Sequence, residues 1–274
     1  MQLPTFLILL GLFAATGLCS ILNFVAHEDD DLLFMNPDIL DRIASGDSVR
    51  TIFLTAGDAG LGPDYWKSRQ AGSLAAYAEM AGVANNWDES DLGIPGKDIP
   101  LYTLGESRQI SLAYLHLPDG SGDGNGFAST GYQSMEKLWK NSIGQIGTVD
   151  GSGTTYTRDE LINTLSQIVN DYQPNEVNAQ DYINDFGTGD HSDHTSGALF
   201  ANQAAVASIF SDTVTAYEGY PTKSLPPNVE GDTLAAKKAA FFTYAAFDTA
   251  ACASDQSCAA TEYEAWLLRQ YALN

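Results

Sequence analysis

Residues 22–34 read LNFVAHEDDDLLF: an apolar run, one histidine, four consecutive acids and a second apolar run. The first run is a continuous hydrophobic segment of the kind found in strands that are buried on both faces of a sheet. The acids lie between two segments that are expected to be buried, where they repel one another and lose hydration. A helix N-terminus, a metal ion or water must compensate their charge. This stretch therefore predicts a strand-to-helix junction that carries a charged site.

The alternation of buried strands and helices continues along the chain. Strands are expected at 21–26, 50–57, 175–181 and 212–220, with a hairpin within 100–120. Helices are expected at 30–46 (interrupted by Pro37), 65–83, 157–174, 195–210, 232–247 and 261–273. The helix at 157–174 is expected to begin with a capping box of Thr157 and Glu160. This order predicts an α/β fold, a Rossmann-like three-layer sandwich with a mostly parallel sheet and helices on both faces.

Two further expectations concern the organisation of this fold. The pattern is continuous enough to predict a single domain over residues 20–274, in which the Gly/Ser/Asp-rich stretch 119–131 is a long exposed loop. In open α/β sheets, sites form at the carboxyl ends of the strands. Side chains at the strand-to-helix junctions are therefore the first candidates for chemistry.

The composition restricts the classes of partner. The chain has 274 residues, with 35 acids against 13 bases and a formal net charge of −22. A surface this negative argues against nucleic acid and anionic membrane as partners, because both attract clusters of Lys and Arg. It suits a soluble protein that works outside the cell.

The N-terminus and the cysteines point to the same compartment. An uncharged apolar stretch from Thr5 to Cys19 predicts a signal peptide over residues 1–19, hence secretion and no stable membrane association after cleavage. The alternative is an uncleaved signal anchor in the endomembrane system. Cys252 and Cys258 bound a polar loop and are expected to form a disulfide, the alternative being two buried free thiols.

The histidines are unevenly distributed. Of the four, His116 follows an alternating run and is expected to be a partly buried strand residue, whereas the other three lie in AHEDDD (26–31) and GDHSDHTSG (189–197). His27 and Asp30 are three residues apart just past a strand, a spacing at which side chains can converge on one cation. With His194 they make two histidines and a carboxylate, a usual ligand set for a zinc ion that keeps a position open for water.

The remaining polar residues of the two stretches suggest catalytic roles. Asp29, beside the metal ligands, is placed to take a proton from that water. His191 is free to donate to a developing oxyanion, with Asp193 as its orienting partner. The alternatives are that the acids 29–31 only cap the following helix and that the HSDH motif is a solvated loop.

AHEDDDLLFMNP, TAGDAG followed by Arg69, and HSDH together resemble motifs of the LmbE/PIG-L family of zinc-dependent N-acetylglucosaminyl de-N-acetylases, over about residues 21–200. The resemblance implies zinc held by His27, Asp30 and His194, with Asp29 as general base, His191 as the oxyanion-stabilising or acid group, Asp193 as its orienting partner and Arg69 facing the substrate pocket. The metal is expected to be zinc, with another divalent ion such as Fe²⁺ as the alternative.

The chain departs from the family pattern at four positions. Glu28 stands where the family has proline, Asp31 where it has glutamate, Gly72 where an acid usually follows the arginine, and Gly189 where some bacterial members have tyrosine. None of these is a metal ligand in the family pattern. Gly72 and Gly189 bear on substrate contacts.

The expected activity is metal-dependent removal of the N-acetyl group from an N-acetylglucosamine-type amino sugar or glycoconjugate. Three alternatives stay open: a non-haem iron oxygenase, a catalytically inactive secreted carbohydrate-binding relative, and a membrane-anchored deacetylase of the glycolipid N-acetylglucosaminyl-phosphatidylinositol. The identity of the acetylated sugar stays open at this point.

Overall fold

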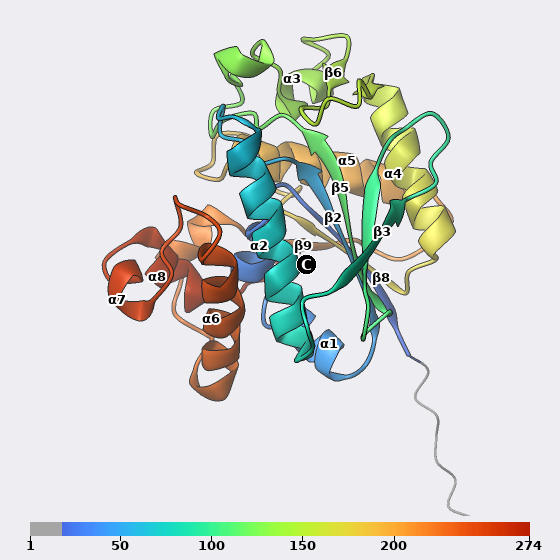
Figure 1. Ribbon diagram of the computed structural model, residues 1–274. Coiled ribbons are helices and arrows are strands. Elements are labelled where there is room, and N and C mark those ends of the chain that lie inside the picture. The colour runs from blue at the N-terminus through green and yellow to red at the C-terminus, as the bar shows by residue number, and fades with distance from the viewer. Residues whose placement is uncertain (1–17) are drawn as a thin grey trace, which may run out of the picture.

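The computed structural model describes residues 18–274 and contains a seven-stranded sheet of order β3-β4-β5-β2-β1-β8-β9 (Figure 1). The parallel strands are β1 (Ser20–Val25), β2 (Ser48–Thr55), β5 (Ile110–Leu117), β8 (Glu176–Gln180) and β9 (Thr215–Tyr217). At one edge, β4 (Pro100–Leu104) runs antiparallel to β5, and β3 (Trp87–Asp91) runs antiparallel to β4. A separate two-stranded sheet pairs β6 (Ile146–Gly147) with β7 (Thr155–Tyr156). The predicted mostly parallel sheet and the hairpin are confirmed.

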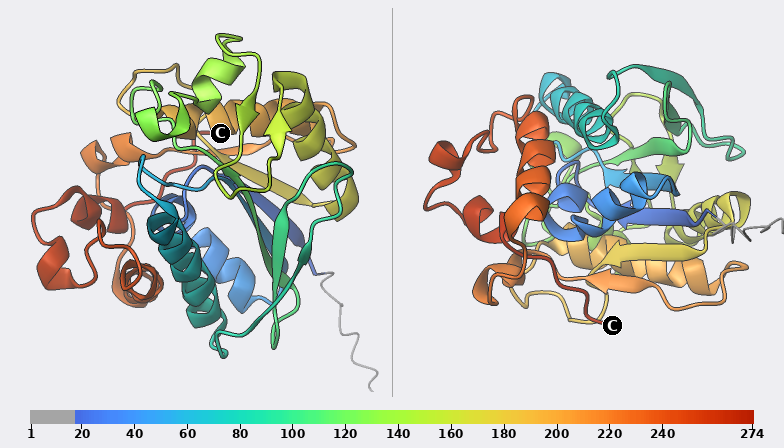
Figure 2. Two further views of the ribbon diagram at one scale, coloured as in Figure 1. Left: turned by 45° about the horizontal axis from the view of Figure 1, so that its top comes forward. Right: turned by 90° about the horizontal axis from the view of Figure 1, so that it is seen from below.

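Helices cover both faces of the sheet, as predicted. On one face lie α1 (Asp38–Ala44) and α2 (Pro63–Ala81), and on the other α4 (Arg158–Tyr172) and α5 (Ser192–Val206), as the right-hand view of Figure 2 shows for α2 and α5. Neighbouring residues of β1 serve the two layers: Phe24 packs with the residues of α4 and α5, and Val25 packs with Tyr77 of α2. Because successive side chains of a strand point to opposite faces, a strand buried on both sides is apolar at most positions rather than at alternate ones.

Several predicted helix boundaries shift in the structure, and the start of α5 and the end of α8 are two of them. α5 begins at Ser192 rather than at Thr195, so the HSDH motif lies in its first turn. α8 (Glu262–Leu267) ends six residues before the predicted end at Leu273, because Leu273 donates its backbone N–H to Ala216 beside β9. The predicted capping box of α4 is confirmed, with Thr157 and Glu160 bonded to each other's backbone N–H.

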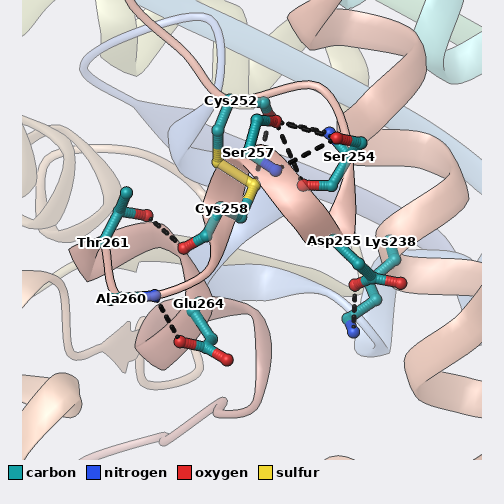
Figure 3. Close-up of a disulfide and its surroundings, with 9 residues drawn as sticks. All are labelled: Lys238, Cys252, Ser254, Asp255, Ser257, Cys258, Ala260, Thr261 and Glu264. Carbon is teal, nitrogen blue, oxygen red and sulfur yellow. Dashed lines mark hydrogen bonds and ion pairs between the residues drawn. A yellow bond between two sulfur atoms is a disulfide. The ribbon is translucent and has the colours of Figure 1, made fainter.

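The segment after β9 forms a helical layer beside α2 (Figures 1 and 2). It contains the short 3₁₀ helix η3 (Tyr220–Ser224), α6 (Gly231–Ala245), α7 (Asp255–Cys258) and α8. The predicted disulfide between Cys252 and Cys258 is present in this layer (Figure 3). None of the helices in the part of the chain that the structure describes has the length and apolar character that a membrane span needs. The predicted signal peptide falls on residues 1–17, outside the described residues, and on Leu18 and Cys19 next to β1.

α6 lies so close to α2 that only glycine fits at position 72. A β-carbon on Gly72 would lie 2.9 Å from the backbone oxygen of Tyr244 and 2.8 Å from its ring. This explains why the acid that the family pattern leads one to expect at position 72 is missing from this chain. Tyr244 and Phe247 of the layer after β9 occupy the space that a side chain at position 72 would need.

We expect Gly72→Ala to lower the free energy of unfolding by about 1–2 kcal/mol, because a backbone atom in contact with the added β-carbon places the cost of overpacking at about 2–3 kcal/mol and the helix propensity of alanine recovers about 1 kcal/mol. Urea-induced unfolding followed by circular dichroism measures the change. Gly144→Ala is the matched control, since nothing lies within 4 Å of a β-carbon at that position. Equal stability of the Gly72 variant and the wild type would contradict this reading of the α2–α6 contact.

Candidate active site

The two motif stretches meet at the carboxyl edge of the sheet. AHEDDD follows β1, and the HSDH motif follows β8, the parallel neighbour of β1. Adjacent parallel strands bring their following loops to the same edge, so residues far apart in sequence become neighbours. Both stretches lie at strand-to-helix junctions, as the sequence predicts.

Asp30 lies between two histidines. One of its carboxylate oxygens is 3.1 Å from His27 Nδ1, and the other is 3.0 Å from His194 Nε2. All three side chains are buried. The backbone N–H of His27 also donates to Asp30, at 2.7 Å, and fixes the carboxylate relative to the end of β1. The structure therefore brings the three predicted metal ligands together.

The orientation of His194 fits a metal ligand. Its Nδ1 lies 2.7 Å from the Asp190 carboxylate, an interaction that fixes the ring and presents Nε2 to Asp30. Nε2 is buried and makes no hydrogen bond to any residue that the structure describes, although Asp30 is 3.0 Å away. This nitrogen and the Asp30 carboxylate oxygen can each give an electron pair to a metal, so a cation could bind both atoms. Imidazole nitrogen and carboxylate oxygen together suit zinc.

His191 completes a group of three imidazoles. Donor atoms of His27, His191 and His194 all lie within 4.8 Å of one another, and the same holds for the set His27, Asp119, His191 and Asp193. The ring centroids of His27 and His191 are 4.6 Å apart. His191 is thus close enough to share a small ligand with the two predicted metal-binding histidines.

The charges around these histidines set their protonation. Burial lowers the pKa of His194, but the carboxylates of Asp190 and Asp30 outweigh burial and raise it to about 10. His27 likewise has a raised pKa, because Asp30 and Asp193 outweigh its burial. Burial and the neighbouring histidines lower the pKa of His191 to about 3, so its imidazole is neutral. The buried carboxylates hold positive charge at the first two positions, as they would hold a metal cation.

The neutral His191 has a defined tautomer. The backbone N–H of Asp193 donates to His191 Nδ1 at 3.1 Å, so the proton of the neutral ring is on Nε2. The Asp193 carboxylate is farther from that nitrogen, at 3.8 Å, and accepts instead from the backbone N–H of Gly120 at 2.7 Å. Asp193 thus contacts His191 through its backbone, and its carboxylate faces His27 at 3.4 Å.

Asp29 is paired with Arg69. A guanidinium N–H of Arg69 donates to Asp29 at 2.7 Å, and a second donates to the backbone oxygen of Gly57 at 2.7 Å. Burial raises the pKa of Asp29, and the guanidinium opposes that rise. Arg69 was expected to face the substrate pocket; the structure places it against Asp29, which itself lines the cavity described below.

Asp248 supplies the acid that is absent at Gly72. It follows α6, and its carboxylate is 3.1 Å from Arg69 Nε and accepts from the Tyr244 hydroxyl at 2.7 Å. Tyr244 in turn accepts from Arg69 at 2.7 Å. The layer after β9 therefore fixes the arginine that contacts Asp29.

Glu28 and Asp31 are both buried, and their hydrogen bonding differs. Glu28 is fully buried, neither of its oxygens has a hydrogen-bond partner among residues 18–274, and burial raises its pKa to about 8. Asp31 accepts a hydrogen bond from the Tyr77 hydroxyl at 2.7 Å, and burial raises its pKa to about 8. Asp30, at the N-cap of the following π-helix η1 (Asp31–Met35), makes no capping hydrogen bond. Asp31 accepts from the backbone N–H of Leu32 at 2.9 Å, so bonding to the helix N-terminus involves Asp31 but does not account for Asp30.

Besides Asp190 and Asp248, the structure adds a third acid that the sequence interpretation missed. Asp119 was assigned to an exposed loop, but it is buried at the end of β5, 3.9 Å from His27 Nε2 and 3.9 Å from His191 Nε2. The rule that selected AHEDDD, an acid directly after a buried strand, would have selected it too. His116 is a buried β5 residue, 2.8 Å from Gln70, away from this cluster.

A cavity of 530 Å³ opens beside the cluster. Asp29, Asp30 and Leu33 line it on one side, and residues of the layer after β9 line it on the other. Its size is in the range of small-molecule sites. A ligand in this cavity contacts both the proposed base and a proposed metal ligand.

Comparison with known proteins gives one family match. The model of the family described as GlcNAc-PI de-N-acetylase (PIG-L) matches residues 22–205. No curated protein matches the sequence.

Several solved structures are similar in fold. N,N′-diacetylchitobiose deacetylase from Pyrococcus horikoshii is 14% identical, with 90% of this chain and 75% of that chain covered and a TM-score of 0.51. A conserved protein from Thermus thermophilus is 15% identical, with coverage of 91% and 85% and a TM-score of 0.49. A 4-carboxy-2-hydroxymuconate hydratase from Pseudomonas putida is 13% identical, with coverage of 91% and 83% and a TM-score of 0.47. At these identities the first likeness shows a shared fold.

Proposed function

The chain belongs to the GlcNAc-PI de-N-acetylase (PIG-L) family, and from this premise we propose that it is a metal-dependent hydrolase that removes the N-acetyl group from an N-acetylated amino sugar or glycoconjugate. The observation that carries the proposal is Asp30 between His27 and His194, with Asp29 on the wall of the adjoining cavity. The parallel sheet and the family membership count against the iron oxygenase considered from the sequence.

His27, Asp30 and His194 would hold the metal, zinc in the first instance and Fe²⁺ as the alternative. A divalent ion at this position supplies Lewis-acid chemistry, by polarising the acetamide carbonyl and making a water molecule more acidic. Asp190 keeps His194 in the tautomer that leaves Nε2 free for a metal, at 2.7 Å from Nδ1.

Asp29 acts as the general base. It takes a proton from the water that attacks the acetyl carbonyl carbon, and Arg69 holds the carboxylate in place at 2.7 Å. His191 donates its Nε2 proton as a hydrogen bond to the oxygen that becomes negative. The proton taken by Asp29 then passes to the leaving nitrogen, the C–N bond breaks, and acetate and the free amine leave.

We further propose a single domain over residues 20–274, secreted after removal of residues 1–19. The disulfide between Cys252 and Cys258 supports an oxidising compartment. N-terminal sequencing of the mature protein tests this, since a retained Met1 would contradict cleavage.

Removal of the metal is expected to abolish acetate release from the responsive substrate of a panel of acetylated amino sugars, and added zinc is expected to restore it. The reason is that the ion would polarise the carbonyl and make the attacking water more acidic, and the hydrogen bond from His191 does not acidify that water. Acetate is measured before chelation, after chelation and after re-addition. Acetate release that is insensitive to chelation would contradict the proposed metal dependence. Purified protein that holds no metal and releases no acetate would favour the inactive carbohydrate-binding relative.

A further inference from the structure

The segment that follows the matched family region forms most of the cavity wall. The family match ends at residue 205, and of the twelve residues that line the cavity, three come from the 29–33 stretch and nine come from after residue 205. The part of the site that performs the proposed chemistry and the part that encloses the rest of a substrate therefore come from different portions of the chain. We call residues 250–266 the specificity wall.

The disulfide and local hydrogen bonds fix the specificity wall (Figure 3). Cys252 and Cys258 close a short loop around α7, and Cys252 itself lines the cavity. Thr261 donates to the backbone oxygen of Cys258 at 2.7 Å, and Lys238 of α6 pairs with Asp255. A cross-linked loop loses little further conformational entropy when a ligand binds to it.

Aromatic side chains connect the metal cluster to this wall. The Tyr220 ring lies 4.9 Å from His194 and is stacked on Trp266 at 4.6 Å. Tyr263 meets Trp266 edge to face at 5.3 Å. Tyr220, Trp266 and Tyr263 all line the cavity, and Tyr263 is only partly buried. Such rings offer an apolar face with a polar tip, which matches the C–H face and the hydroxyls of a sugar ring.

All the charged residues that line the cavity are acidic. Its twelve lining residues, all within the described part of the chain, include Asp29, Asp30 and Glu262 but no Lys, Arg or His. With Asp30 assigned to the metal, the lining residues Asp29 and Glu262 offer a phosphate group on the wall no positive partner. The nearby cations are already paired, Arg69 with Asp29 and Lys223 with Glu262.

From this wall we infer that the enzyme takes an uncharged N-acetylated saccharide, whose second ring packs against Tyr263, and discriminates against phosphate-bearing glycolipids. The inference rests on the proposed function and specifies its substrate class. The inference favours a free glycan as substrate over the phosphatidylinositol glycolipid, which the sequence left open as an alternative.

The test compares acetate release from N,N′-diacetylchitobiose and from N-acetylglucosaminyl-phosphatidylinositol in detergent micelles. We expect kcat/KM to be at least about 100-fold higher for the uncharged disaccharide, because the residues that line the cavity offer the phosphate carboxylates and no cation. Tyr263→Ala is expected to raise KM for the disaccharide about tenfold with kcat and metal content unchanged, and Tyr263→Phe, which keeps the ring face but loses the hydroxyl, is expected to raise KM less than Tyr263→Ala does. Tyr132→Ala, at a position 58% exposed and not among the cavity-lining residues, is the matched control. Glu262→Gln, which frees Lys223, should raise the rate on the phosphate-bearing substrate several-fold.

Equal use of the two substrates, or an unchanged KM in Tyr263→Ala, would overturn the inference while leaving the proposed function intact. If neither substrate releases acetate, the proposed function fails on these substrates, and calorimetric binding of diacetylchitobiose decides the inference on its own. Weaker binding by Tyr263→Ala than by the wild type and Tyr263→Phe would support the inference that the second sugar ring packs against Tyr263. Equal binding by all three proteins, or no binding by any, would overturn it.

Discussion

Asp29→Asn is expected to lower kcat for deacetylation by about 10²–10⁴-fold while leaving the bound metal and KM close to the wild-type values. Asparagine keeps the shape of aspartate and can still contact Arg69, which lies 2.7 Å from the native carboxylate. It cannot accept a proton from the attacking water. The loss is therefore confined to the chemical step. Loss of a base would lower kcat in this way with the metal retained, whereas loss of a metal ligand would lower the metal content.

Steady-state kinetics, metal analysis by mass spectrometry and the unfolding midpoint together test the role of Asp29. Asp123→Asn, at an exposed position outside the cavity lining, is the matched control and should retain full activity. If Asp29→Asn binds metal and turns over normally, another group must take the proton. Asp119, 3.9 Å from both His27 and His191, is then the next candidate. If the variant loses the metal, Asp29 is a ligand and not a free base.

His194→Ala is expected to remove the metal, to about one-tenth occupancy or less, and with it the acetate release. The residue is buried and its Nε2 faces Asp30 at 3.0 Å, so its removal leaves only His27 and Asp30 of the three proposed ligands. Asp190→Asn should have a smaller effect, because it weakens the interaction that orients the ligand; such changes typically cost 10–100-fold in metal affinity or activity.

His116→Ala is the control for the loss of a buried histidine as such. His116 belongs to β5 and contacts Gln70 rather than the proposed metal ligands, so this variant is expected to keep its metal. Circular dichroism shows whether each variant is folded. A folded His194→Ala protein with full metal content would contradict the ligand assignment and direct attention to His191, whose donor atoms lie within 4.8 Å of those of His27.

The chemistry-bearing stretches could be identified from the sequence because their signals are local. The run 21–26 is apolar at every position except Asn23 because β1 is buried on both faces, and the acids begin just after the strand ends. The i, i+3 spacing of His27 and Asp30 is also a local property. The capping box at Thr157 and Glu160 identified the start of α4 for the same reason.

Asp119 and the helix after Glu262 were misjudged because burial and helix length depend on distant partners. Asp119 follows β5 as Asp29 follows β1, but its Gly-rich neighbourhood indicated an exposed loop; the first turn of α5 covers it, with His191 3.9 Å away. The periodic pattern 261–273 continues past Leu267, yet the chain leaves the helix there to contact Ala216 beside β9.

The sequence by itself determined the α/β alternation, the two strand-to-helix junctions and the residue types that stand at them, because strand burial and side-chain spacing act over a few residues. Tertiary structure alone decided that AHEDDD and the HSDH motif converge, that Asp248 rather than residue 72 accompanies Arg69, and that the segment closed by Cys252 and Cys258 faces Asp29 across a cavity. These are relations between distant segments, and they are fixed by which strands are neighbours in the sheet and by how closely α6 packs on α2 at Gly72.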